Sequence, residues 1–100
     1  MAKGYWIARV DVHDEEGYKA YEANNPAIFK KFGGKYVARG GKVTGLEGQS
    51  RSRNVVIEFE SYEKALACYQ SPEYQANIKL RLPHSNADLI VVEGYDGPQP

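Results

Sequence analysis

The stretch Asn54–Glu60 constrains the fold most, because its side chains alternate between two kinds. One set is wholly apolar, namely Val55, Ile57 and Phe59, and the set between them contains Val56, Glu58 and Glu60. Alternation of this kind predicts a β-strand with one dry face and one mixed face. Tyr5–His13 alternates in a similar way, so we expect a second strand of the same type there.

Further segments predict two more strands and two helical regions. Strands are expected at Lys35–Arg39 and Ala87–Glu93, with Val43–Glu47 as a continuation of the former or a short extra strand. The first helix is expected to begin at the N-cap Asp14 and to end at Gly33-Gly34, with Pro26 kinking or dividing it. Ser61 and Ser71-Pro72-Glu73 predict two helix starts in the second region, and Pro83 is expected to end it.

The resulting order, β-α-β-β-α-β, predicts an α+β, ferredoxin-like domain. In that fold a four-stranded antiparallel sheet carries both helical regions on one face. We expect one domain over residues 1–96 and a short tail at 97–100.

The helix-free face of such a sheet predicts a second copy of the chain. Its expected residues are too apolar for open water and too charged for a simple core: Tyr5, Ile7, Arg9, Val37, Arg39, Val56 and Glu58. Two such faces packed together would bury both, and symmetric dimers are the commonest way to achieve this. We therefore expect a homodimer whose two sheets form a shared α/β barrel.

Composition excludes several classes of function. Thirteen basic residues balance thirteen acidic ones, so the positive field that drives nonspecific nucleic-acid binding is absent. The amino terminus has no signal-peptide run, and no stretch is apolar enough to span a membrane. Cys68 is the single cysteine, which favours a reducing, cytoplasmic setting. Two isolated histidines and one cysteine predict no metal site, and no motif predicts a cofactor.

Arg39-Gly40-Gly41 is the most suggestive candidate for ligand binding. The glycines allow close approach of the backbone to a ligand, and Arg39 offers a bidentate clamp for an anion. The alternative is a β-bulge with Arg39 paired to Glu58. Arg9 and Glu58 are expected to meet Arg39 across the sheet, either as a site in which Glu58 acts as a general base or as a plain ion-pair network.

Several other residues are further candidates for a functional role. His13 follows the first strand beside Asp11 and is either a base or an exposed turn histidine, whereas His84 has no obvious partner. Tyr69 either bounds the site or packs in the core. Arg51 and Arg53 are expected to form a solvated cationic patch on a loop, and Cys68 to be buried and inert.

Several motifs together resemble a known family. They are Lys3-Gly4-Tyr5-Trp6-Ile7-Ala8, Ala38-Arg39-Gly40-Gly41, Val56-Ile57-Glu58-Phe59, Ser71-Pro72-Glu73-Tyr74-Gln75-Ala76 and Val92-Glu93-Gly94. In order and spacing they resemble family 1330 of the domains of unknown function, over about Met1 to Gly94. That family is similar to the dimeric α/β-barrel group, which includes cofactor-free monooxygenases, isomerases and haem-degrading proteins. The resemblance implies the fold and a homodimer but no reaction. Cys68 departs from the pattern, since many relatives have tryptophan there.

Three functions remain open from the sequence. The first is a homodimer that binds a small aromatic or anionic metabolite in a pocket of each protomer, with Arg39 on its negative group and Glu58 and Tyr69 at its borders. The second is a cofactor-independent monooxygenase or isomerase-like enzyme, which needs Glu58 or His13 within reach of a substrate proton. The third is a structural or regulatory dimer without a ligand.

Overall fold

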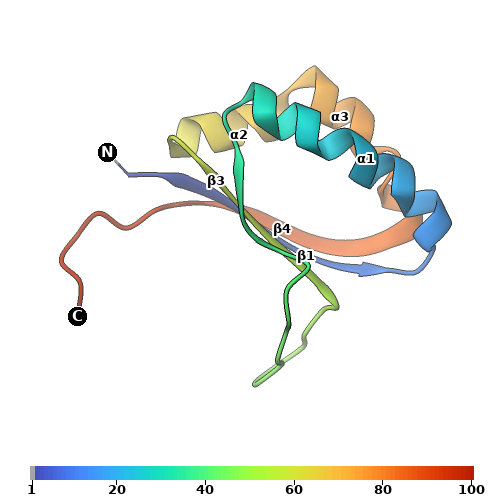
Figure 1. The fold of residues 1–100 in the computed structure, drawn as a ribbon, viewed down its shortest axis with the longest axis horizontal. Coiled ribbons are helices and arrows are strands. Elements are labelled where there is room, and N and C mark those ends of the chain that lie inside the picture. The colour runs from blue at the N-terminus through green and yellow to red at the C-terminus, as the bar shows by residue number, and fades with distance from the viewer. Residues whose placement is uncertain (1) are drawn as a thin grey trace.

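The computed structural model describes residues 2–100 and has the ferredoxin-like α+β fold expected from the sequence. Its sheet has the strand order β2-β3-β1-β4, and all neighbouring strands are antiparallel. The helices cover one face of this sheet, and the other face is left open (Figure 1). The elements in chain order are β1 (Gly4–Val12), α1 (Glu15–Lys31), β2 (Lys35–Arg39), β3 (Arg53–Phe59), α2 (Tyr62–Gln70), α3 (Pro72–Ile78), the 3-10 turn η1 (Leu82–His84) and β4 (Ser85–Glu93).

The three predicted helix caps are confirmed. The Asp14 side chain accepts a hydrogen bond from the Gly17 amide, and Ser61 accepts one from the Lys64 amide. Ser71 accepts one from the Tyr74 amide, so it separates α2 from α3. Each bond satisfies an amide that has no partner within its own helix. The expected end of α3 at Pro83 was wrong, because α3 stops at Ile78 and Pro83 lies in η1.

Helix α1 runs through Pro26 without being divided. A proline inside a helix removes one backbone hydrogen bond and weakens the ladder there. Three side-chain amides bind α1 to α3 at this point: Asn24 Nδ2 donates to Asn77 Oδ1, and Asn77 Nδ2 donates to Asn25 Oδ1, both at 2.9 Å. Asn77 Nδ2 also lies 3.2 Å from the Tyr21 carbonyl oxygen. These bonds between the two helices explain why the predicted division does not occur.

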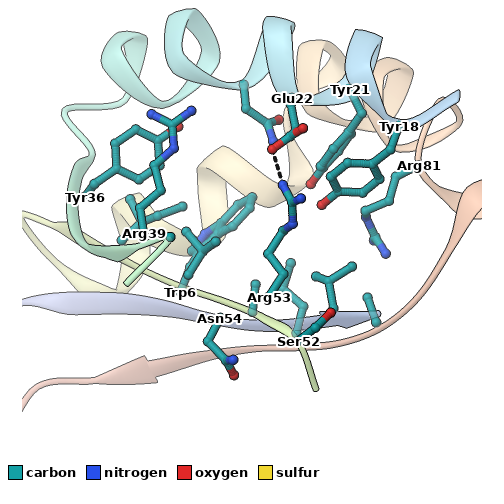
Figure 2. Close-up of a pocket in the computed structure, with 18 of the residues that line it drawn as sticks. Trp6, Tyr18, Tyr21, Glu22, Tyr36, Arg39, Ser52, Arg53, Asn54 and Arg81 are labelled. Carbon is teal, nitrogen blue, oxygen red and sulfur yellow. Dashed lines mark hydrogen bonds and ion pairs between the residues drawn. The ribbon is translucent and has the colours of Figure 1, made fainter. Parts of the chain in front are cut away.

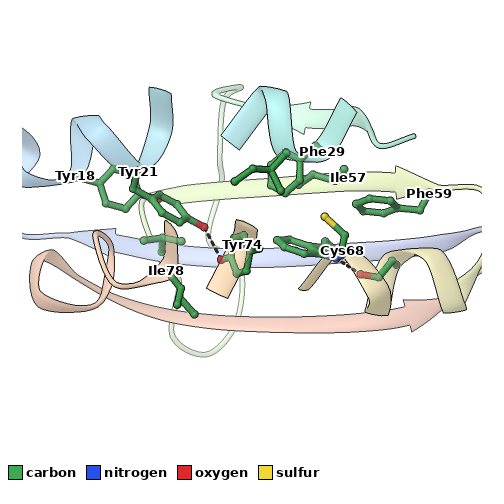
Figure 3. Close-up of a cluster of buried hydrophobic side chains, with 12 residues drawn as sticks. Tyr18, Tyr21, Phe29, Ile57, Phe59, Cys68, Tyr74 and Ile78 are labelled. Atoms are coloured by element: carbon green, nitrogen blue, oxygen red, sulfur yellow. Dashed lines mark hydrogen bonds between the residues drawn. The ribbon is translucent and has the colours of Figure 1, made fainter. Parts of the chain in front are cut away.

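Figure 3 shows the buried core between the sheet and the helices, and the indole of Trp6 belongs to this core. It is 1% exposed, and its Nε1 donates a 2.7 Å hydrogen bond to the Ala65 carbonyl of α2. Four other aromatic rings surround it, with centroids 4.9 to 6.0 Å away: Tyr74, Phe29, Tyr69 and Phe59. Trp6 therefore links β1 to α1, β3, α2 and α3.

A β-bulge in β2 changes which face of the sheet its last residues occupy. Tyr36 pairs with Ile57, but Ala38 rather than Val37 pairs with Val56, so Val37 is an inserted residue. Arg39 then pairs with Val55, whose side chain lies on the helix-covered face. The prediction that Arg39 shares the open face with Arg9 and Glu58 was therefore wrong. An inserted residue reverses the side-chain parity of everything after it.

Residues 40–52 form a loop, so the predicted strand at Val43–Glu47 was also wrong. Gly40 and Gly48 both have φ of +70°, a conformation that favours glycine and breaks a strand. The loop extends from the sheet on the side opposite the helices (Figure 1). It carries two exposed apolar side chains, Val43 and Leu46.

We expect the substitution Trp6→Phe to lower the free energy of unfolding by about 2 kcal/mol. The smaller ring leaves space in the core and removes the donor that bonds to the Ala65 carbonyl. Urea denaturation monitored by circular dichroism measures the change. The control, Tyr95→Phe, alters a side chain that is 70% exposed and should leave the midpoint unchanged. Equal stability of the Trp6 variant and the parent would contradict the central role of this residue.

Candidate functional site

A cavity of about 440 Å³ lies between α1 and the sheet (Figure 2). Its floor is apolar and comes from β1, β3 and β4: Trp6, Ala8, Val10, Val55, Ile57, Ala87 and Leu89. Its roof is the inner side of α1, which contributes Glu15, Tyr18, Tyr21, Glu22, Asn25 and Phe29. The remaining lining comes from three places: β2 and the turn after it (Tyr36, Arg39, Gly40 and Gly41), the start of β3 and the residue before it (Ser52, Arg53 and Asn54), and the turn after α3 (Arg81). Aromatic rings and guanidinium groups thus line the same cavity.

Arg53 at the start of β3 is neutralised by carboxylates of α1. Its Nη1 forms an ion pair with Glu22 Oε2, and its Nη2 lies 3.6 Å from Glu15 Oε2. Its guanidinium carbon is 5.1 Å from the centre of the Tyr18 ring. The predicted solvated patch was wrong for Arg53, and it was wrong for Arg51, which pairs with Asp11 and Asp88 at 3.0 Å.

Arg39 has an aromatic partner but no carboxylate partner. Its guanidinium carbon lies 4.4 Å from the centre of the Tyr36 ring, a cation–π contact. Within residues 2–100 no Asp or Glu oxygen lies within 4.0 Å of it. The alternative pairing of Arg39 with Glu58 is therefore absent. The charge of Arg39 borders the cavity without an internal counter-ion.

The phenols of Tyr18 and Tyr36, which line the cavity, are neutral hydrogen-bonding groups. Burial raises the pKa of Tyr18 to about 12, and burial is also the main reason that the pKa of Tyr36 is raised. A phenol with a raised pKa keeps its proton at neutral pH and can donate a hydrogen bond to an oxygen acceptor. The tyrosines thus contribute polar tips on apolar rings and no negative charge.

Three of the predicted ligand-binding residues border the cavity and three do not. Arg39, Gly40 and Gly41 line it. Arg9 and Glu58 lie on the open face, where Arg9 Nη1 is 3.9 Å from Asp88 Oδ2 and Glu58 accepts a 3.1 Å hydrogen bond from the Tyr5 hydroxyl.

Tyr69 belongs to the core rather than to the lining of the cavity. Its ring centre lies 5.8 Å from that of Trp6 and 5.3 Å from that of Tyr74. Of its two predicted roles, the structure therefore favours packing.

The two histidines lie at one end of the sheet. His13 is exposed, and its backbone amide donates a 3.0 Å bond to the His84 carbonyl. His84 was expected to have no partner, but its Nδ1 lies 3.0 Å from Asp14 Oδ2. Neither histidine lines the cavity. Among residues 2–100, no three His, Cys, Asp or Glu side chains gather as a metal site would require.

Sequence reasoning missed several residues of the cavity, above all Arg53, Arg81 and Glu22. Tyr18, Tyr21 and Glu22 share one side of α1 because residues three and four apart in a helix are neighbours. This spacing of three and four residues is visible in the sequence and could have predicted that the three side chains line one site. Nothing local indicates that Arg81, distant along the chain, joins them.

Comparison with known proteins shows the family of the chain. The model of the family described as "Domain of unknown function (DUF1330)" matches residues 3–95. The chain belongs to this family. No curated protein sequence matches the chain significantly.

DUF1330 itself has no assigned activity, and three solved structures resemble this member of it. A protein of unknown function from Rhodopseudomonas palustris, RPA0582, has a TM-score of 0.72 at 18% identity, over 96% of this chain and 85% of its own. SnoaB, a cofactor-independent oxygenase from Streptomyces nogalater, has a TM-score of 0.67 at 12% identity, over 100% of this chain and 97% of its own. A dimeric ferredoxin-like protein of unknown function from Bacteroides fragilis has a TM-score of 0.61 at 12% identity, over 91% and 95%. At these identities the likeness shows the fold alone.

Two further observations concern the DUF1330 chain as a whole. None of the helices within residues 2–100 combines the length and apolar character needed to cross a membrane. Cys68, where many relatives were expected to have tryptophan, is fully buried in α2, as predicted.

We expect Cys68 to resist alkylation in the folded protein. Burial raises the pKa of its thiol to about 12, so in mildly alkaline buffer the reactive thiolate is scarce and the sulfur is also inaccessible. Intact mass spectrometry after treatment with iodoacetamide should show no adduct in native buffer. The same treatment in guanidinium chloride is the control and should give complete single labelling. Rapid labelling of the native protein would contradict the assigned burial.

Proposed function

We propose that the protein binds a small anionic aromatic molecule in the cavity of each protomer. The single observation that carries this proposal is Arg39, whose charge borders a cavity walled by aromatic rings and has no carboxylate partner. A carboxylate or phenolate of the ligand would accept two parallel hydrogen bonds from the guanidinium. Its ring would lie against the apolar floor, where aromatic side chains favour edge and offset contacts.

The backbone next to Arg39 supports the same proposal. Gly40 has φ of +70°, and a Cβ added at Gly40 or Gly41 would meet no atom within 4 Å. Open space therefore surrounds the main chain beside the guanidinium, as a ligand that approaches closely would need.

Binding is better supported than catalysis. The two predicted bases, Glu58 and His13, do not line the cavity, and Glu22, which does, is engaged by Arg53. A cofactor-independent oxygenase remains the second candidate, favoured by the likeness of the whole chain to SnoaB. A purely structural dimer is the least supported, because an open cavity with an unpaired arginine is not a self-filled interior.

We expect wild-type protein to bind benzoate measurably and the variant Arg39→Met to bind it at least about tenfold more weakly, since a charge-assisted bond is lost. Isothermal titration calorimetry with benzoate, salicylate and the uncharged analogue benzamide measures this. The matched control is Lys42→Met, which removes an exposed positive charge close by in the chain.

Two results would refute the proposal. One is binding of benzamide as tightly as benzoate, and the other is unchanged affinity of the Arg39 variant. Turnover of a phenol or quinol by metal-free wild-type protein would instead favour the oxygenase.

We further propose that the open sheet face is covered by a second copy of the chain. Adjacent residues in register form an apolar row across all four strands: Ala38, Val56, Ile7 and Ile90. Ile90 is 55% exposed and Val92 beside it is 39% exposed. A self-complementary face of this kind suits a two-fold dimer, and one of the structural neighbours is described as dimeric.

We expect Ile90→Asp to convert the dimer into a monomer, because a carboxylate in the apolar row would lose its hydration on assembly. Sedimentation velocity at micromolar concentration measures the mass. Ala20→Asp, at an exposed position on α1, is the control and should stay dimeric. Sedimentation of the wild-type protein as a single chain would refute the proposed dimer.

A further inference from the structure

Arg81 is a buried arginine held in a fixed position. It lies in the turn after α3 and is only 6% exposed. Its amide donates to the Ile78 carbonyl at 2.9 Å, and its own carbonyl accepts bonds from the His84 amide at 3.0 Å and the Ser85 hydroxyl at 3.1 Å. The side chain extends from this turn beneath Tyr18 and Tyr21 into the cavity (Figure 2).

The charge of Arg81 has no negative partner. Its guanidinium carbon is 5.6 Å from the centre of the Tyr21 ring, and no carboxylate within residues 2–100 lies within 4.0 Å of it. Its Nε is buried and has no hydrogen-bond partner. Buried charges are normally paired and buried donors normally bonded, so this arrangement costs stability.

The nearby tyrosines do not neutralise Arg81. The hydroxyls of Tyr21 and Tyr74 are 2.6 Å apart, so the two phenols bond to each other. Burial strongly raises the pKa of Tyr74, which keeps its phenol uncharged at neutral pH. The two hydroxyls also interact with the Arg81 side chain as hydrogen-bonding dipoles, but no carboxylate within residues 2–100 compensates its charge.

Comparison with Arg53 shows what Arg81 lacks. Both guanidiniums face the same cavity, yet Arg53 has Glu22 and Glu15 beside it. Arg81 and Arg39 have tyrosines beside them in place of carboxylates, and Figure 2 shows them on opposite sides of the labelled residues, with Trp6 and Arg53 between them. An anion delivered from solution would supply the missing partner at each.

We propose that Arg81 is a second anion-binding residue of the cavity, so that the ligand class is an aromatic molecule with two anionic groups. One anionic group would bind Arg39 and the other Arg81, with the ring over the apolar floor between them. This inference rests on the proposed function and narrows it from aromatic anions in general to aromatic dianions.

The test compares acids that differ in their second charge. Isothermal titration calorimetry is run with benzoate, phthalate, isophthalate, terephthalate and naphthalene-2,6-dicarboxylate, which span a range of carboxylate spacings. For wild-type protein at least one dicarboxylate should bind about tenfold or more tightly than benzoate, since it gains one further charge-assisted contact. In Arg81→Met this preference should vanish while benzoate still binds.

A second readout separates a binding residue from a structural one. Because Arg81 is unpaired in the free protein, Arg81→Met should leave the urea midpoint unchanged or raise it. A residue retained only for structure would lower the midpoint on substitution. Lys79→Met, which removes an exposed charge from the same turn, is the matched control and should change neither affinity nor midpoint.

The outcomes distinguish the two proposals. If benzoate binds in an Arg39-dependent way but no dicarboxylate is preferred, or if Arg81→Met keeps the preference, the role of Arg81 is refuted and the proposed function stands. If Arg81→Met lowers the midpoint and leaves the affinities unchanged, Arg81 is structural and the inference fails. If none of the acids binds to wild-type protein, the proposed function fails and this inference fails with it.

Discussion

The buried indole of Trp6 is the contact on which the fold and the cavity both depend. Its Nε1 is bonded to the Ala65 carbonyl, and its ring touches aromatic side chains from every layer of the molecule. The same ring forms part of the cavity floor. The hydrogen bond at Nε1 fixes one edge of the indole, so the part of the ring that lines the cavity is held in a defined position. The core and the candidate site therefore both depend on the packing around Trp6.

The three arginines of the cavity show how one residue type serves different purposes. Arg53 is paired with two glutamates and ties β3 to α1. Arg39 and Arg81 lie beside tyrosines and have no carboxylate partner among residues 2–100. Arg81 is only 6% exposed, so its charge without a carboxylate partner opposes stability. Arg39 is exposed, so its guanidinium is open to a partner from solution.

Much of the fold was predictable because its signals are local. Alternation in Asn54–Glu60 identified β3, and the capping side chains of Asp14, Ser61 and Ser71 identified the helix starts. The site was predictable only in part, because it depends on non-local events. The insertion of Val37 moves Arg39 to the other face of the sheet. No sequence pattern in the five residues of β2 predicts this insertion. Arg81 lies near α1 because α3 and η1, on either side of it in the chain, pack against α1.

Both ends of the loop over residues 40–52 line the cavity. Gly40 and Gly41 line the cavity where the loop leaves β2, and Ser52 lines it where the loop returns to β3. Its middle extends past the helix-free side of the sheet, and Gln49 accepts a hydrogen bond there from Arg9 (Figure 1). A molecule bound against Val43 and Leu46 on the helix-free side would therefore contact the same loop whose two ends line the cavity on the other side of the sheet.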